Sequence, residues 1–104
     1  MKESDNIQEI QMIEQTIQNL LLQKQAFQME LSETQQALEE IRNAGEEVFK
    51  IIGQLMLKTD KKKIEEELKN KEKLLNLRVT TMEKQENALN EKLTSLRDAV
   101  VDSK

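Results

Sequence analysis

The side chains that most often carry out chemistry in proteins are missing from this sequence. It has no histidine and no cysteine, so it lacks the commonest general base, the commonest metal ligand and any thiolate. Its only glycines are Gly45 and Gly53, which leaves no glycine-rich loop for a phosphate group. The acidic residues follow the faces of expected helices and form no sheltered pair. We therefore expect no catalytic residue, no metal site, no cofactor and no enzymatic activity.

The basic residues do not form a pattern typical of a nucleic-acid site. The densest basic cluster is the run from Lys61 to Lys63, and the whole chain has a net charge of −4. Only two aromatic side chains, Phe27 and Phe49, could stack on bases. A run of three lysines is more typical of a solvated turn, although at a helix start it would oppose the macrodipole. We expect no nucleic-acid partner.

The apolar residues are too dispersed to form a membrane anchor. No apolar run approaches the ~20 residues that a helix needs to cross a bilayer. The polar, acidic N-terminal region does not resemble a signal peptide. We therefore expect no membrane association and a cytoplasmic location, with which the absence of cysteine is compatible.

Length and composition indicate which elements must carry any function. A chain of 104 residues fits one subunit, residues 1–104, and its two aromatics cannot support a large globular core. Two glycines and no proline leave few loops. This composition is typical of long helices that bury a narrow seam, so the chain is expected to be mostly α.

Apolar residues recur at alternating spacings of three and four in both halves of the chain, as in a coiled coil. The row in the first half is Ile10, Ile13, Ile17, Leu20, Lys24, Phe27, Leu31, Thr34, Leu38 and Ile41. The second half has an apolar row and a mostly polar one, namely Leu68, Leu75, Met82, Leu89 and Leu96, and Ile64, Lys71, Arg78, Gln85, Lys92 and Ala99. We expect helices over residues 5–44 and 60–102. Gly45 is expected in the left-handed conformation after the first, and Thr59 or Asp60 as the cap of the second.

The two rows match layer by layer if the chain folds back on itself. Leu38 then lies opposite Leu68, and Ile17 lies opposite Leu89, without any insertion between them. The midpoint of this match lies between Ile52 and Gly53. The pattern predicts a long antiparallel two-helix coiled coil, although pairing of each helix with other chains would also satisfy it.

The segment at this midpoint, EEVFKIIGQLMLKT, is rich in apolar and β-branched residues and predicts a single β-hairpin over residues 46–59. With a turn at Ile52-Gly53, the expected cross-strand pairs are Ile51–Gln54, Lys50–Leu55, Phe49–Met56 and Val48–Leu57. Strand alternation then places Phe49, Ile51 and Met56 on one face, and Val48, Leu55 and Leu57 on the other.

An isolated hairpin with two apolar faces and two open edges is marginal in water and prone to aggregate. We therefore expect hairpins from several subunits to join into a β-barrel hub that covers these faces. The oligomerisation residues would be Val48, Phe49, Ile51, Ile52, Gly53, Leu55, Met56 and Leu57.

The order helix, "VFKIIGQLMLK", helix resembles the β-type subunits of prefoldin. The flanking stretches "MELSETQQALEEI" (29–41) and "EELKNKEKLLNLRVTTMEKQENALNEKL" (66–93) agree, so that the resemblance covers roughly residues 7–97. The single hairpin and short length fit the β type, and length and composition favour an archaeal member. The resemblance implies a hexamer of two α-type and four β-type subunits. It also implies that the complex holds unfolded proteins at the coiled-coil ends without ATP and passes them to a group II chaperonin.

The expected client-binding residues are apolar side chains near the two chain ends. Apolar side chains at helix ends that open readily could contact any exposed hydrophobic segment. The set is Ile7, Ile10, Met12, Ile13, Ile17, Leu93, Leu96, Val100 and Val101. Two alternatives stay open: that these residues only complete the seam or contact neighbouring subunits, and that the chain is a structural coiled-coil adaptor for one specific protein partner.

Overall fold

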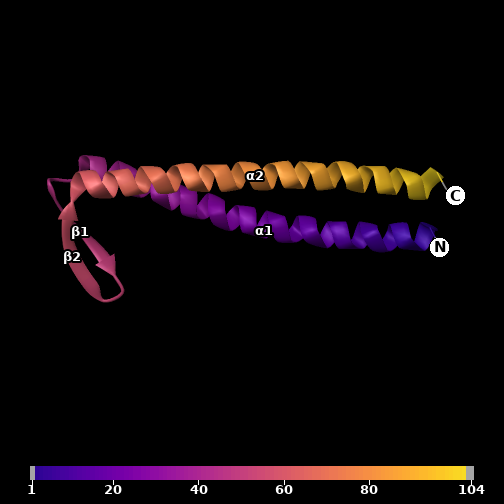
Figure 1. The fold of residues 1–104 in the computed structure, drawn as a ribbon, viewed down its shortest axis with the longest axis horizontal. Helices are drawn as coiled ribbons and strands as arrows, with labels where there is room; N and C mark the ends of the chain where they lie inside the picture. Colours follow the sequence, from indigo (N-terminus) through magenta and orange to yellow (C-terminus); the bar gives the residue numbers. More distant parts are fainter. Residues whose placement is uncertain (1, 103–104) are drawn as a thin grey trace. The chain divides into compact units, whose positions relative to one another are not determined.

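The computed structural model describes residues 2–102, with side chains from Ser4 onward. The sequence analysis expected helices over 5–44 and 60–102 around a hairpin over 46–59. The elements, in chain order, are α1 (Lys2–Asn43), β1 (Glu47–Ile52), β2 (Leu55–Asp60) and α2 (Lys61–Asp102), as Figure 1 shows. They form two compact units. The terminal unit holds the residues up to Ala26 and those from Arg78 onward, and the hairpin unit holds residues 27–77.

In the terminal unit the two helices run antiparallel, so that the start of α1 and the end of α2 lie together (Figure 1). Ion pairs join the helices on their exposed flanks: Glu9 Oε1 lies 3.0 Å from Lys92 Nζ, and Glu14 Oε1 lies 2.8 Å from Arg97 Nη2. These contacts lie within one chain. They confirm the expectation that the chain folds back on itself.

The hairpin unit contains the same antiparallel pairing and the two strands. Glu30 Oε1 lies 3.2 Å from Lys71 Nζ, and Arg42 Nε lies 3.4 Å from Glu65 Oε1. The strands follow the last residues of α1 and precede the first of α2, and the hairpin projects to one side of these helix ends (Figure 1).

The row predicted for α1 is confirmed, because all ten of its positions are buried or half-buried. Its two polar members have partners. Lys24 Nζ donates to Glu86 Oε2 at 2.9 Å, and Thr34 Oγ1 donates to the carbonyl oxygen of Glu30 at 2.8 Å. A polar group buried without a hydrogen bond is costly, so these contacts explain how Lys and Thr are tolerated in an apolar row.

One of the two rows predicted for α2 is wrong. The apolar row is buried or half-buried as expected, but Lys71, Arg78, Gln85, Lys92 and Ala99 are exposed. The second inward row lies one residue further along and consists of Glu72, Val79, Glu86, Leu93 and Val100. The buried face of a helix contains two adjacent rows, so the apolar row could be joined by the row on either side of it. In α2 it is joined by the row that contains Val79, Leu93 and Val100, which buries two valines and a leucine.

The predicted register of the β-hairpin is also wrong. The pairs are Ile52↔Leu55, Ile51↔Met56, Lys50↔Leu57, Phe49↔Lys58, Val48↔Thr59 and Glu47↔Asp60. The two-residue turn is therefore Gly53-Gln54. Gly53 has a φ of 60°, and no other described residue has a positive φ. A positive φ at the first turn position alone is the pattern of a type II′ turn, which places glycine first, where the prediction had placed it second.

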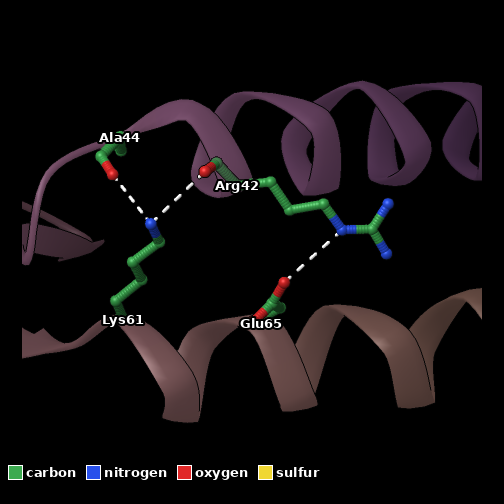
Figure 2. Close-up of polar contacts among 4 residues, drawn as sticks. All are labelled: Arg42, Ala44, Lys61 and Glu65. Atoms are coloured by element: carbon green, nitrogen blue, oxygen red, sulfur yellow. Dashed lines mark hydrogen bonds and ion pairs between the residues drawn. The ribbon is translucent and has the colours of Figure 1, made fainter.

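Gly45 does not take the left-handed conformation that the sequence analysis expected. The end of α1 is closed instead by Lys61, whose Nζ donates to the carbonyl oxygens of Arg42 and Ala44 (Figure 2). The cap of α2 is as predicted, because Asp60 Oδ1 accepts a hydrogen bond from the backbone N–H of Lys62 at 3.2 Å.

The seam can be tested with two leucines of α2 in the hairpin unit. Leu75 is 3% exposed, whereas Leu77 is 63% exposed. We expect Leu75→Ala to lower the free energy of unfolding by about 2–4 kcal/mol, because it leaves a cavity between the helices. Leu77→Ala, its matched control, should change it by no more than about 0.5 kcal/mol. Urea unfolding followed by circular dichroism at a fixed subunit concentration measures both, and equal effects would contradict the seam.

The two glycines make a matched test of the turn. Gly53→Ala forces a Cβ into the left-handed region, which costs about 1–2 kcal/mol. We expect amide hydrogen exchange in β1 and β2 to accelerate roughly 5- to 30-fold. Gly45 has a negative φ and open space where a Cβ would lie. Gly45→Ala should therefore leave exchange in the strands unchanged, and strand exchange that is insensitive to Gly53→Ala would argue against the turn.

Candidate protein-binding surfaces

The described residues offer no enclosed site for chemistry. No group of three acidic, histidine or cysteine side chains in residues 2–102 is placed to hold a metal ion. The depressions on the helices are shallow, and one is lined only by polar and charged side chains of α2, between Lys62 and Lys73. No helix in this part of the chain is long and apolar enough to cross a membrane. What the structure does offer is exposed apolar surface.

The largest collection of exposed apolar side chains is on the β-hairpin. We call it the hairpin surface, and it consists of Val48, Phe49, Ile51, Ile52, Leu55, Met56 and Leu57. Val48 is half-buried, and the other six are exposed. Ile51 and Met56 lie directly opposite each other and are 67% and 65% exposed, so the chain itself does not cover them.

Both faces of the hairpin contribute to this surface. Residues opposite each other share a face, so Phe49, Ile51 and Met56 lie on one side, and Val48, Leu55 and Leu57 on the other. This grouping is as predicted although the register is not. The register differs by two residues, and only a shift by an odd number moves side chains to the other face.

The charged side chains of the two strands lie outside the segment from Ile51 to Met56, and three of the four form ion pairs. Lys50 Nζ lies 3.2 Å from Glu67 Oε2 of α2, and Lys58 Nζ lies 3.1 Å from Glu47 Oε1 on the opposite strand. Exposed pairs of this kind contribute at most about 1 kcal/mol each. The outer part of the hairpin, from Ile51 to Met56, contains no charged residue.

The hairpin also has backbone groups to offer. A two-residue turn makes the flanking pair Ile52↔Leu55 hydrogen-bonded, and such pairs alternate with non-hydrogen-bonded ones. The N–H and C=O groups of Phe49 and Ile51 on β1, and of Met56 and Lys58 on β2, therefore point outward along the two edges. Edges of this kind can pair with strands of another chain.

A shallow apolar groove lies where the hairpin meets the helices. It is lined by Ala37, Glu40, Ile41, Ala44, Glu47, Val48, Phe49, Ile64 and Leu68. The small side chains of Ala37 and Ala44 leave space there, and Phe49 connects the groove with the hairpin surface. The apolar surface of the hairpin thus continues onto the helices of the same unit.

The nine residues expected to contact clients differ in accessibility. Ile13 and Leu93 are 6% and 7% exposed and lie in the seam of the terminal unit. Half-buried positions are Ile10, Ile17, Leu96 and Val100. Ile7, Met12 and Val101 are exposed, and Met12 lies in a shallow depression of α1 with Gln8, Gln11, Gln15 and Thr16. In this conformation only those three of the nine are exposed, Ile7 less so than Met12 and Val101.

The sequence analysis gave no role to a second set of exposed apolar side chains. They are Leu21, Leu22, Met29, Leu74 and Leu77. Each falls outside the three–four spacing of the buried rows, which is the only signal in the sequence that sets them apart. They are too scattered to define a site, but they provide controls of matched size and exposure for the surfaces above.

Comparisons with known proteins agree with this architecture. The family model described as "Prefoldin subunit" matches residues 4–102. The chain is 44% identical over 89 residues to the prefoldin subunit beta of Thermococcus onnurineus, covering 84% of this chain and 77% of the relative. It is 37% identical over 93 residues to that of Sulfurisphaera tokodaii, covering 88% of this chain and 74% of the relative.

A solved structure extends the match to the fold. The crystal structure of the prefoldin beta subunit from Thermococcus strain KS-1 superimposes with a TM-score of 0.90 at 35% sequence identity. The match covers 97% of this chain and 90% of the other. Sequence and fold therefore point to the same assignment over almost the entire length. The chain belongs to the family of prefoldin β subunits, which are non-enzymatic chaperones.

Proposed function

We propose that this chain is the β subunit of a hexamer with two α-type and four β-type subunits. The complex would hold unfolded proteins without ATP and deliver them to a group II chaperonin in the cytoplasm. The observation that carries the proposal is an apolar β-hairpin that is exposed on both faces, in a chain whose terminal unit also exposes apolar side chains. The first surface serves assembly and the second serves clients.

Assembly follows from the physical state of the hairpin. Two strands with two exposed apolar faces and two open edges are marginal alone and aggregate readily. Edge-to-edge pairing with the hairpins of an α-type subunit and of further copies of this chain removes the edges and buries the faces. A closed β-barrel hub satisfies both requirements at once, and the uncharged part of the hairpin from Ile51 to Met56 can enter it without burying a charge.

Client holding follows from the terminal unit. Exposed apolar side chains with few neighbours can contact many different hydrophobic segments, and Met12 adds a flexible, polarisable side chain. Ile13 and Leu93 hold the helices together and become available only if the pair opens, whereas Ile7, Met12 and Val101 are accessible already. We infer that these three make the first contacts.

The proposal as a whole is tested by reconstitution with an α-type subunit. Native mass measurement should give a hexamer, and the hexamer should suppress the aggregation of several unrelated unfolded proteins in the absence of ATP. Handover is tested by adding a group II chaperonin and measuring transfer of the held protein. Failure to suppress aggregation, combined with one tight and specific ligand, would favour a structural adaptor in its place.

The assembly role of the hairpin is tested by placing charge on it. We expect the double substitution Ile51→Lys with Met56→Lys to abolish hexamer formation with an α-type subunit, because a closed hub would bury two unpaired ammonium groups. Leu77→Lys, at a position 63% exposed on α2, is the matched control and should assemble normally. Native mass spectrometry reports the outcome, and a hexamer with both lysines present would remove the hairpin from the interface.

The client role is tested with two methionines of α1. Met12 and Met29 are 71% and 67% exposed, but only Met12 belongs to the proposed client surface. We expect Met12→Gln with Val101→Gln to lower aggregation suppression several-fold while leaving the hexamer intact. Met29→Gln should have no effect. Light scattering of a diluted unfolded protein measures this, and equal losses in the two variants would show that exposed hydrophobicity acts without regard to place.

A further inference from the structure

The C-terminal end of α1 lacks the left-handed glycine closure that many helices have. The last carbonyl groups of a helix have no partner within it and are often satisfied by a glycine in the left-handed conformation. Gly45 stands at the right place in the sequence but has no positive φ. The one backbone bond recorded there runs from the N–H of Ala44 to the carbonyl oxygen of Ile41 at 3.3 Å.

Lys61, the first residue of α2, supplies the missing closure. Its Nζ donates to the carbonyl oxygen of Ala44 at 2.8 Å and to that of Arg42 at 3.3 Å (Figure 2). A positive charge is favourable at the C-terminal end of a helix and unfavourable at the N-terminal end. The ammonium group of Lys61 thus opposes the dipole of its own helix, while it meets the favourable end of the other.

A second contact joins the same two helices one turn away. Glu65 follows Lys61 by four residues, and its Oε1 lies 3.4 Å from Arg42 Nε (Figure 2). On the hairpin side, Lys50 of β1 is joined to Glu67 of α2 at 3.2 Å. The short connection from Ala44 to Glu46 therefore has a contact to α2 on each side. The end of α1 is joined to Lys61 and Glu65, and β1 is joined to Glu67.

We propose that Lys61 is a positioning residue, whose ammonium group fixes the end of α1 against the start of α2 and thereby sets the direction in which the hairpin leaves the helices. Gly45 and Glu46 are exposed, a Cβ at Gly45 would meet nothing within 4 Å, and half-buried Ala44 is held by its hydrogen bond from Lys61. The consequence for assembly rests on the proposed function of the hairpin. A hairpin held in one direction enters a closed hub without first having to be ordered, and ordering on binding weakens association.

The direction of the hairpin can be measured directly, because the chain has no cysteine. Spin labels on Gln54→Cys at the turn and Lys69→Cys on α2 report the distance between hairpin and helix, both sites being exposed. Labelled chain is diluted with unlabelled chain, so that double electron–electron resonance measures only distances within one molecule. We expect a narrow distance distribution in this background, and one at least about twice as wide after Lys61→Met, since several weakly coupled junction conformations become accessible.

Neighbouring lysines and a conservative change provide the controls. Lys62→Met and Lys63→Met remove the same charge from the same turn but leave the contacts to Arg42 and Ala44, so both should keep the narrow distribution. Lys61→Arg should keep the narrow distance distribution, because a guanidinium can donate to both carbonyl oxygens. Lys61→Gln, which is shorter and uncharged, should behave like Lys61→Met. An unchanged width in Lys61→Met would overturn the proposal.

Assembly gives the second readout. We expect Lys61→Met to weaken association with an α-type subunit about tenfold, the scale of a hydrogen bond to a charged group, with Lys61→Arg and Lys62→Met close to the unsubstituted chain. Helical ellipticity should be equal in all variants. Its loss in both Lys61→Met and Lys61→Gln would also overturn the proposal, since Lys61 would then be needed for folding. If the unsubstituted chain fails to assemble, the proposed function fails, while the distance widths still decide the role of Lys61.

Discussion

The two long helices can bury apolar side chains only against each other, along a seam one side chain deep. Few residues become buried under this constraint, and among the described positions the buried hydrophobic ones are Ile13, Leu38, Leu75, Val79 and Leu93. The same constraint decides how polar residues enter the seam. The Lys24 ammonium and the Glu86 carboxylate meet there at 2.9 Å, with side chains 17% and 23% exposed, and each offsets part of the cost of removing the other from water.

The exposure of the hairpin also follows from the packing of the two helices against each other. Helices that pack against each other cannot fold over the strands, so both faces of the hairpin stay exposed within the chain. This exposure is the reason for proposing that other subunits cover them. Ion pairs at the base, from Lys50 to Glu67 and from Lys58 to Glu47, compensate charge where the strands meet water and the helices. The outer part of the hairpin has no charged residue and could be enclosed in the proposed hub without burying a charge. The charged residues nearer the helices can stay in contact with water.

The features that follow from the spacing of apolar residues along a single helix or strand could be predicted from the sequence. The inward row of α1 and the two faces of the hairpin follow from spacing alone, and both are correct in the structure. Three predictions failed where the answer depends on a second element. The apolar row from Leu68 to Leu96 could be completed on either side, and in the structure the row with Val79 and Leu93 turns toward α1. Gly45 does not cap α1, because Lys61, a residue distant in sequence, donates to the carbonyl oxygen of Ala44. Matching the layers of the helices placed the turn one residue early, because the connections at the hairpin base need not be symmetric.

Within the terminal unit, one pair of helices has to stay together and also present apolar surface, and the helical period separates these tasks. Ile13 lies on the seam and is 6% exposed, whereas Met12, one residue earlier, is rotated by about 100° on the helix and faces water. Val100 and Val101 differ in the same way. Substitution at a seam position therefore acts on helix pairing, whereas substitution at its exposed neighbour changes the surface on which we propose that clients bind. The exposed side chains can therefore change without changing the packing of the closed helix pair.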